Sequence, residues 1–254
     1  MQFQTVFKRY ELKYVLTRSQ KDALMRQMES CMLPDPYGES TIRNLYFDTD
    51  TYRLIRRSIE KPVYKEKLRI RSYRQVSSDD TVFIELKKKY QSVVYKRRLA
   101  LTQQEAMDWM AGGSRPVDGQ IAEEIAYFCD YYETLHPVVF ISYDRQAFYS
   151  DTDENLRISF DENIMSRQDE LSLTTEPGGD RILDADCVLM ELKTAGGLPL
   201  WLTHFLAENK LFKTSFSKYG TAYQKQIFCK AVSTDISEQT ESELYDREEG
   251  MAYA

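Results

Sequence analysis

Charged side chains recur two positions apart along most of the segments that alternate like strands, and this pattern restricts the fold more than any other feature. The segment 65–73, KEKLRIRSY, places four basic residues on one face, with Leu68 and Ile70 on the other, because successive side chains of a strand point to opposite faces. Seven of eight predicted strands carry charged residues on one face in this way, at 9–13, 65–71, 85–87, 96–98, 143–145, 157–161 and 191–193.

Period-2 alternation predicts eight strands, at 6–16, 42–48, 65–74, 81–90, 92–101, 137–149, 156–161 and 186–195. Short polar links between several of these segments predict hairpins and therefore an antiparallel sheet. Helices are predicted after the capping boxes that begin at Thr17 and Thr102, and over 121–132, 198–212, 217–232 and, briefly, 50–59. Residues 162–185 are predicted to form a mobile excursion.

The formal net charge of −6 resides at the end of the chain. Residues 231–254 contain seven acidic residues and one basic residue, so residues 1–230 sum to zero. We therefore predict one domain over 1–230 and an acidic, disordered tail over 231–254. A neutral body argues against a nucleic-acid partner, because a general nucleic-acid binder carries an exterior basic stripe.

The cysteines and the first residues indicate a reducing compartment. Four cysteines lie far apart without a CxxC pair, which predicts buried, reduced thiols. The start, MQFQTVFKRYELKY, lacks the apolar stretch of a signal peptide, and no segment approaches ~18 apolar residues. We expect a cytoplasmic protein without an intrinsic membrane segment, and nothing in the sequence indicates a protein partner.

Two architectures place aliphatic residues on one face of a sheet and charges on the other. An open sheet with a wet face usually mixes Ser, Thr, Asn and Gln among its charges. A barrel with helices outside turns its charged face inward. Because the charged face here is rich and regular, we predict an α+β fold, an eight-stranded antiparallel β-barrel whose charged interior forms a tunnel, with helices packed outside.

An interior with about ten cations and few anions needs counter-charge from a ligand, because unpaired buried charge is very unfavourable. A chain of phosphates supplies closely spaced oxygens for Arg and Lys. Three glutamates, Glu11, Glu85 and Glu191, each precede a cation by two positions. They either balance these cations or hold Mg²⁺ or Mn²⁺, hard ions that take carboxylate and phosphate oxygens together.

Nine short motifs follow one another along the body: RYELKY (9–14), NLYFDT (44–49), KLRIRSY (67–73), IELKKK (84–89), YKRR (95–98), YDRQAF (143–148), RISFDENI (157–164), MELK (190–193) and SFSKYG (215–220). In this order they resemble the VTC domain, the polyphosphate polymerase branch of the CYTH-like triphosphate tunnel metalloenzymes. Each motif alone is weak, but nine with fitting spacing, from about residue 5 to residue 228, are a specific signal.

The resemblance implies that a tunnel barrel binds a metal-bound nucleoside triphosphate and transfers its γ-phosphate to a growing polyphosphate chain. By position it implies a phosphate-binding lining of Lys13, Arg69, Arg71, Lys87, Lys96, Arg145 and Arg157, a hydroxyl donor at Tyr143, further phosphate contacts at Ser217 and Lys218, and a metal ligand at Glu191. We assign catalysis to Lys13, Arg69, Arg71 and Arg157. We extend phosphate binding to Lys67, Arg98 and Lys193, and Glu11 and Glu85 stay further metal candidates.

The predicted function is that of a phosphotransferase with Mn²⁺ or Mg²⁺ as cofactor, and with a nucleoside triphosphate such as ATP and inorganic polyphosphate as partners. Arg9 stands where hydrolytic relatives in the superfamily have the first glutamate of Glu-x-Glu-x-Lys, which agrees with the polymerase branch. Two alternatives stay open. A hydrolase of tripolyphosphate or nucleoside triphosphate would use water as the acceptor, and a non-catalytic polyphosphate-binding module would bind polyanions without turnover.

Overall fold

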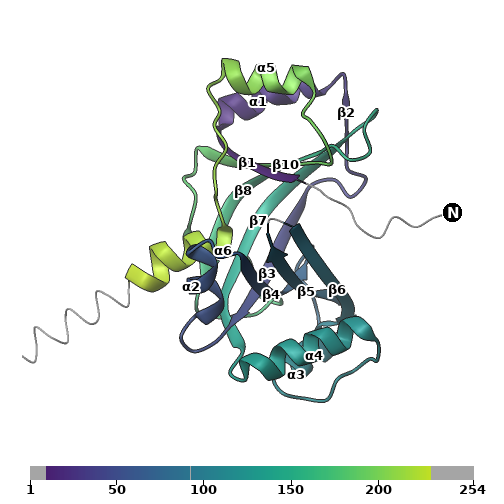
Figure 1. The fold of residues 1–254 in the computed structure, drawn as a ribbon, viewed down its shortest axis with the longest axis vertical. Coiled ribbons are helices and arrows are strands. Elements are labelled where there is room, and N and C mark those ends of the chain that lie inside the picture. Colours follow the sequence, from purple (N-terminus) through teal and green to yellow (C-terminus); the bar gives the residue numbers. More distant parts are fainter. Residues whose placement is uncertain (1–9, 92, 230–254) are drawn as a thin grey trace, which may run out of the picture.

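An antiparallel sheet dominates the computed structural model, which describes residues 10–91 and 93–229 (Figure 1). Eight long strands follow the order β1-β10-β8-β7-β3-β4-β5-β6, and the short strands β2 and β9 pair with β7 and β8. The strands are β1 (Tyr10–Thr17), β2 (Met32–Pro34), β3 (Ser40–Asp48), β4 (Tyr64–Ser72), β5 (Thr81–Tyr90), β6 (Val93–Thr102), β7 (His136–Ser150), β8 (Arg157–Arg167), β9 (Asp180–Arg181) and β10 (Cys187–Thr194).

The helices of the described residues are α1 (Arg18–Met28), α2 (Arg53–Ile59), α3 (Gln103–Met110), α4 (Gln120–Tyr132), α5 (Leu200–Glu208), α6 (Lys218–Ala222) and the π-helix η1 (Tyr223–Phe228). The predicted capping boxes are confirmed, because Thr17 and Thr102 each accept a backbone hydrogen bond from the third helical residue, whose side chain bonds back. The predicted excursion at 162–185 is wrong at its start, since β8 continues to Arg167, and β9 lies within it.

The predicted closure of the sheet into a barrel is wrong, and the sheet has ten strands rather than eight. In the described part of the chain, β1 and β6 end the strand order and share no backbone pairing. A side-chain contact spans part of the gap, where Lys87 on β5 lies 3.5 Å from Glu11 on β1. Strand alternation fixes the face of each side chain but does not decide whether the two edge strands pair, so the pattern could not predict closure.

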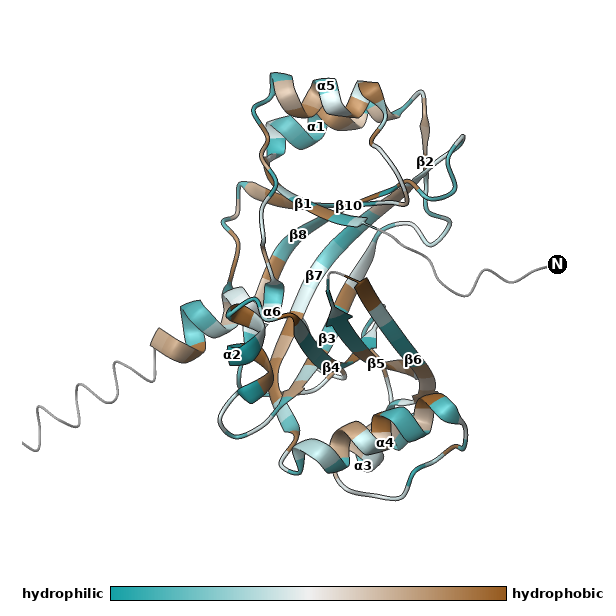
Figure 2. Cartoon of the chain, viewed as in Figure 1, coloured by the Kyte–Doolittle hydropathy of each residue, from teal (hydrophilic) through white to brown (hydrophobic). Residues whose placement is uncertain are grey.

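Four helices cover the convex face, as predicted. Helices α1 and α5 pack on β1, β8 and β10 through residues such as Leu24, Phe205 and Leu192. Helices α3 and α4 pack on β4, β5 and β6 through residues such as Trp109 and Leu86. Figure 2 shows hydrophobic and hydrophilic patches succeeding one another along the long strands, because alternate residues face the helices and the interior.

The remaining helical segments correct the prediction that all helices lie outside. Helices α2, α6 and η1 contribute to an apolar cluster that also contains Tyr46 on β3 and Tyr143 on β7. Those two tyrosines line the interior cavity, so this cluster covers one part of the concave face. The charged part of the concave face therefore borders on this apolar cluster.

The cysteines and helices bear on the predicted compartment. The prediction of four buried thiols is wrong, because Cys31, Cys129 and Cys187 are only half-buried and Cys229 is exposed. Within the described ranges, no helix combines the length and the apolar character needed to cross a bilayer. The predicted acidic tail, 231–254, Arg9 and the predicted strand residues 6–9 lie outside the described residues.

Candidate phosphate-binding site

A cavity of about 730 Å³ occupies the concave face, and its lining comes from strands at both ends of the sheet order and from α6 with its preceding loop. The strand alternation that sends aliphatic residues to the helices sends charged residues inward. Eleven basic side chains line the cavity: Lys13, Lys67, Arg69, Arg71, Lys87, Lys89, Lys96, Arg145, Lys193, Lys213 and Lys218. The lining carboxylates are Glu11, Glu85 and Glu191.

Most residues that the sequence assigns to the site lie together in this lining: Glu11, Lys13, Lys67, Arg69, Arg71, Glu85, Lys87, Lys96, Tyr143, Arg145, Glu191, Lys193, Ser217 and Lys218. Arg98 lies beside the cavity, where its Nε donates to Glu85 at 2.7 Å. Arg157 is the exception, because its side chain is exposed and is not part of the lining. It shares the inward face of β8 with Asp161 but stands at the first residue of the strand, beyond the cavity.

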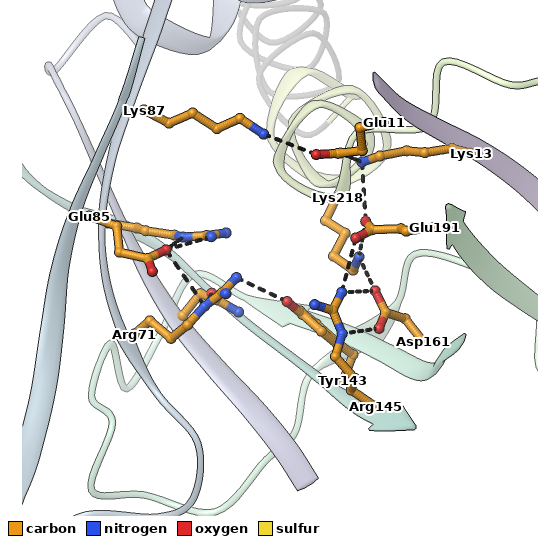
Figure 3. Close-up of polar contacts among 12 residues, drawn as sticks. Glu11, Lys13, Arg71, Glu85, Lys87, Tyr143, Arg145, Asp161, Glu191 and Lys218 are labelled. Atoms are coloured by element: carbon orange, nitrogen blue, oxygen red, sulfur yellow. Dashed lines mark hydrogen bonds and ion pairs between the residues drawn. The ribbon is translucent and has the colours of Figure 1, made fainter. Parts of the chain in front are cut away.

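Glu85 is the centre of one charge cluster (Figure 3) and is only 1% exposed. Its oxygens lie 2.7 Å from Arg69, 2.6 Å from Lys96 and 3.9 Å from Arg71. Burial opposes the charged form of Glu85, but the neighbouring cations outweigh it and hold the carboxyl pKa far below its usual value. Glu85 therefore stays ionised and fixes the guanidinium groups around it.

A second cluster joins Arg145 and Lys218 to two carboxylates. Asp161 accepts from Arg145 Nε and Nη2 at 2.6 Å each and from Lys218 at 2.5 Å. Glu191 accepts from the same two side chains at 3.1 Å each and lies 3.2 Å from Lys13. Burial disfavours the charge on Glu191, but Lys218, Lys13 and Arg145 together keep its pKa well below the ordinary value.

Glu11 links the edge strand to the opposite wall. It lies 3.3 Å from Lys13 on its own strand and 3.5 Å from Lys87 on β5. Burial would raise its pKa, but Lys87 and Lys13 outweigh this effect and lower it to about 2. Because the side chain of Glu11 is 30% exposed, it is the most accessible of the three lining carboxylates.

Several lining lysines have no carboxylate within ion-pair distance among the described residues: Lys67, Lys89, Lys193 and Lys213. Lys67 donates to Ser217 Oγ at 3.0 Å, and its ammonium lies 5.9 Å from the centre of the Tyr219 ring. Burial, followed by repulsion from Lys13 and Lys87, lowers the pKa of Lys67 to about 7. Burial likewise lowers the pKa of Lys193. Lys67, Lys89 and Lys193 are half-buried and Lys213 is exposed, so the cavity holds basic groups without a carboxylate in contact, as a site that an anion completes would.

The motif residue Asp48 fixes the position of α6 and hence of Ser217 and Lys218. The Asp48 carboxylate is fully buried and accepts from the backbone of Leu54 and Ile55 at the start of α2. It also accepts from the hydroxyl of Tyr219 at 2.8 Å. The β3 motif therefore holds α2 and α6 in place, while Ser217 caps α6 by accepting from Gly220.

Among the described residues, the acidic side chains of the cavity offer a divalent metal two carboxylates at most. No group of three or more His, Cys, Asp or Glu side chains gathers in metal-binding geometry within the part of the chain that the structure describes. Glu11 and Glu191 are nevertheless joined through Lys13 and line the same cavity. Two carboxylates together with phosphate oxygens and water suit Mg²⁺, which keeps several waters and binds through one or two carboxylates.

Some lining and supporting residues escaped the sequence reasoning. Tyr46 and Tyr219 line the cavity and stack with ring centroids 4.9 Å apart. Lys89 and Lys213 also line it. Asp161 contacts Arg145 and Lys218 from outside the lining. The sequence does indicate that its side chain points inward, because Asp161 lies two positions after Ser159 on β8. Lys213 lies in a loop, where no periodic pattern indicates which way a side chain points.

Comparisons with known proteins give a family and a similar fold. The family model of the VTC domain matches residues 8–227. No curated protein sequence matches the chain. A solved structure described as a candidate adenylate cyclase from Bacillus halodurans is 14% identical, covers 84% of this chain and 94% of its own, and has a TM-score of 0.52. One from Vibrio parahaemolyticus, described likewise, is 11% identical, with 86% and 98% coverage and a TM-score of 0.45. At these identities the likeness concerns the fold alone.

Proposed function

Because the chain belongs to the VTC domain family, we propose that it is a metal-dependent polyphosphate polymerase that transfers the γ-phosphate of ATP to inorganic polyphosphate. The observation that carries this proposal is the cavity, where eleven basic residues face three carboxylates. A phosphate chain supplies the missing negative charge at closely spaced oxygens, which suits Arg forks and Lys ammonium groups.

The proposed reaction needs no covalent protein intermediate. A terminal oxygen of the polyphosphate attacks the γ-phosphorus, the bond from that phosphorus to the β,γ-bridging oxygen breaks, and the nucleoside diphosphate leaves. The attacking oxygen is already ionised, so no protein group has to remove a proton. Arg69, Arg71, Lys13 and Lys218 neutralise and align the phosphates, which is the main requirement of phosphoryl transfer.

Glu191 is the best-placed metal ligand of the three glutamates. Glu85 is the sole carboxylate partner of Arg69, Lys96 and Arg98 among the described ion pairs, so engaging it elsewhere would leave several cations unbalanced. Glu191 shares Arg145 and Lys218 with Asp161, and Lys13 with Glu11, so these cations keep a partner when Glu191 is engaged. A bound Mg²⁺ or Mn²⁺ would neutralise charge on the phosphate oxygens, and Glu11 would be its second protein ligand.

An assay that resolves products by chain length tests this function. The protein is incubated with ATP and Mn²⁺, and polymer of many phosphates is expected to accumulate with ADP. Orthophosphate as the sole phosphate product would overturn the proposal in favour of a hydrolase. Binding of polyphosphate without any ATP consumption would indicate a binding module instead.

A further inference from the structure

Arg145 and Lys218 are each held by two carboxylates that occupy different positions relative to the cavity (Figure 3). Glu191 lines the cavity, whereas Asp161 is not part of the lining and is fully buried. The contacts of Asp161 are the shorter ones, at 2.5–2.6 Å against 3.1 Å for Glu191. Asp161 therefore contacts the two cations on the side away from the cavity, and Glu191 contacts them on the cavity side.

We propose that Asp161 is a positioning residue, which keeps Arg145 and Lys218 in their phosphate-binding orientation when Glu191 is drawn away by a metal ion. This proposal rests on the phosphate-binding part of the proposed function. The two contacts from Arg145 to separate oxygens of Asp161 fix the plane of the guanidinium group. They leave the face toward the cavity for ligand oxygens.

The aromatic ring of Tyr143 supports the same orientation. The Arg145 guanidinium lies 5.1 Å and the Lys218 ammonium 4.3 Å from the centre of that ring. Without Asp161, this neutral ring and Glu191 would be the groups holding both cations. A metal ion that engaged Glu191 would then leave the two cations free to turn away from the ligand.

The test compares Asp161→Asn with Glu191→Gln by calorimetric binding of tripolyphosphate, with and without Mg²⁺. Each change removes one negative charge next to a polyanion site, so a purely electrostatic role predicts tighter metal-free binding in both variants. The positioning role predicts that Asp161→Asn weakens tripolyphosphate binding about tenfold or more when Mg²⁺ is present, because the charge-assisted contacts to the ligand are then misaligned. Without metal, Glu191 still holds both cations, so the loss of affinity is smaller. Glu191→Gln is expected to tighten metal-free binding and to lose the response to Mg²⁺.

Two further variants keep the outcome decisive. Glu162→Gln changes the neighbouring acid on β8, which contacts Lys21 rather than the cavity, and should bind like the wild type. If Asp161→Asn fails to fold, Asp161→Glu takes its place in the test. The negative charge stays, but the longer side chain displaces the guanidinium group of Arg145. We therefore expect weaker tripolyphosphate binding with a near-wild-type melting temperature. Wild-type affinity of Asp161→Asn or Asp161→Glu with Mg²⁺ present, or a loss of affinity that is as large without the metal as with it, would overturn the proposal. If the protein made no polymer from ATP, the proposed polymerase activity would be wrong. The role of Asp161 would stand, because tripolyphosphate binding is measured independently of turnover.

Discussion

The basic residues of the cavity differ in how their charge is compensated. The arginines Arg69 and Arg145 contact carboxylates, which fix their planar groups. Lys67 and Lys193 face the cavity without such partners among the described residues. Arginine suits fixed, two-pronged recognition of phosphate, and lysine acts as a more adaptable point charge. The cavity therefore combines rigid phosphate contacts with a more permissive basic wall.

Arg69→Ala is expected to weaken tripolyphosphate binding by about 1.5–3 kcal/mol, because one charge-assisted contact is lost. The fold should persist, since Glu85 keeps Lys96 and Arg98 as partners. Arg157→Ala is the matched control, because Arg157 lies outside the lining. Calorimetry measures both variants, and equal affinities for the two would contradict the assignment of the cavity as the phosphate site.

The protonation of Lys67 makes binding depend on pH. Its pKa of about 7 in the empty cavity lies below the ordinary 10.5, and a bound anion raises it again. Binding above pH 7 therefore takes up a proton, so the affinity of the wild type relative to Lys67→Met should fall as pH rises, by at most about tenfold per pH unit. Tripolyphosphate titrations from about pH 6 to about pH 9 check this. If the affinity of the wild type relative to that of Lys67→Met stays constant over this pH range, Lys67 does not take up a proton on binding.

At the scale of elements, the site depends on α6, which continues directly into η1, so that one short helical segment runs from Lys218 to Phe228. A segment of this length is marginally stable alone and depends on its tertiary contacts. The buried Asp48 holds α6 in position, because it accepts a hydrogen bond from the Tyr219 hydroxyl. Asp48 also accepts from the backbone of Leu54 at the start of α2. The motif NLYFDT thus contributes to the site by placing the helix that carries Lys218, although Asp48 itself is not in the lining.

Tyr219→Phe removes the hydroxyl that α6 donates to Asp48. We expect a loss of about 1–3 kcal/mol in the free energy of unfolding, together with weaker tripolyphosphate binding, because Ser217 and Lys218 lose their fixed position. Urea unfolding and calorimetry measure the two effects. Tyr127→Phe, at an exposed tyrosine of α4, is the control and should change neither. Unchanged binding in Tyr219→Phe would mean that α6 is held by its apolar contacts alone.

The sequence pattern predicted the elements better than their connections. Alternation placed Arg69, Glu85 and Glu191 on inward faces correctly, because a strand's period fixes the face of each side chain. The same rule placed Arg157 inward but carries no information about how far along the strand the cavity extends. The contact of Lys67 with Ser217 joins residues 150 positions apart, so no local pattern could indicate it.

At the scale of the whole molecule, the sheet is a trough whose two edge strands are not joined by backbone pairing in the described residues. Eight alternating strands predict such a sheet, but alternation alone does not decide whether its two edge strands pair. Glu11 and Lys87 cross the gap with a partly exposed ion pair, which is a weak link in water.

The central claim is that the basic cavity holds a chain of phosphates, and a crystal structure of the protein with tripolyphosphate tests it most directly. The account predicts density for successive phosphates inside the cavity, within hydrogen-bond distance of Arg69, Arg71 and Lys218. Tripolyphosphate bound on the convex face or at Arg157, with the cavity free of it at saturating concentration, would contradict the account.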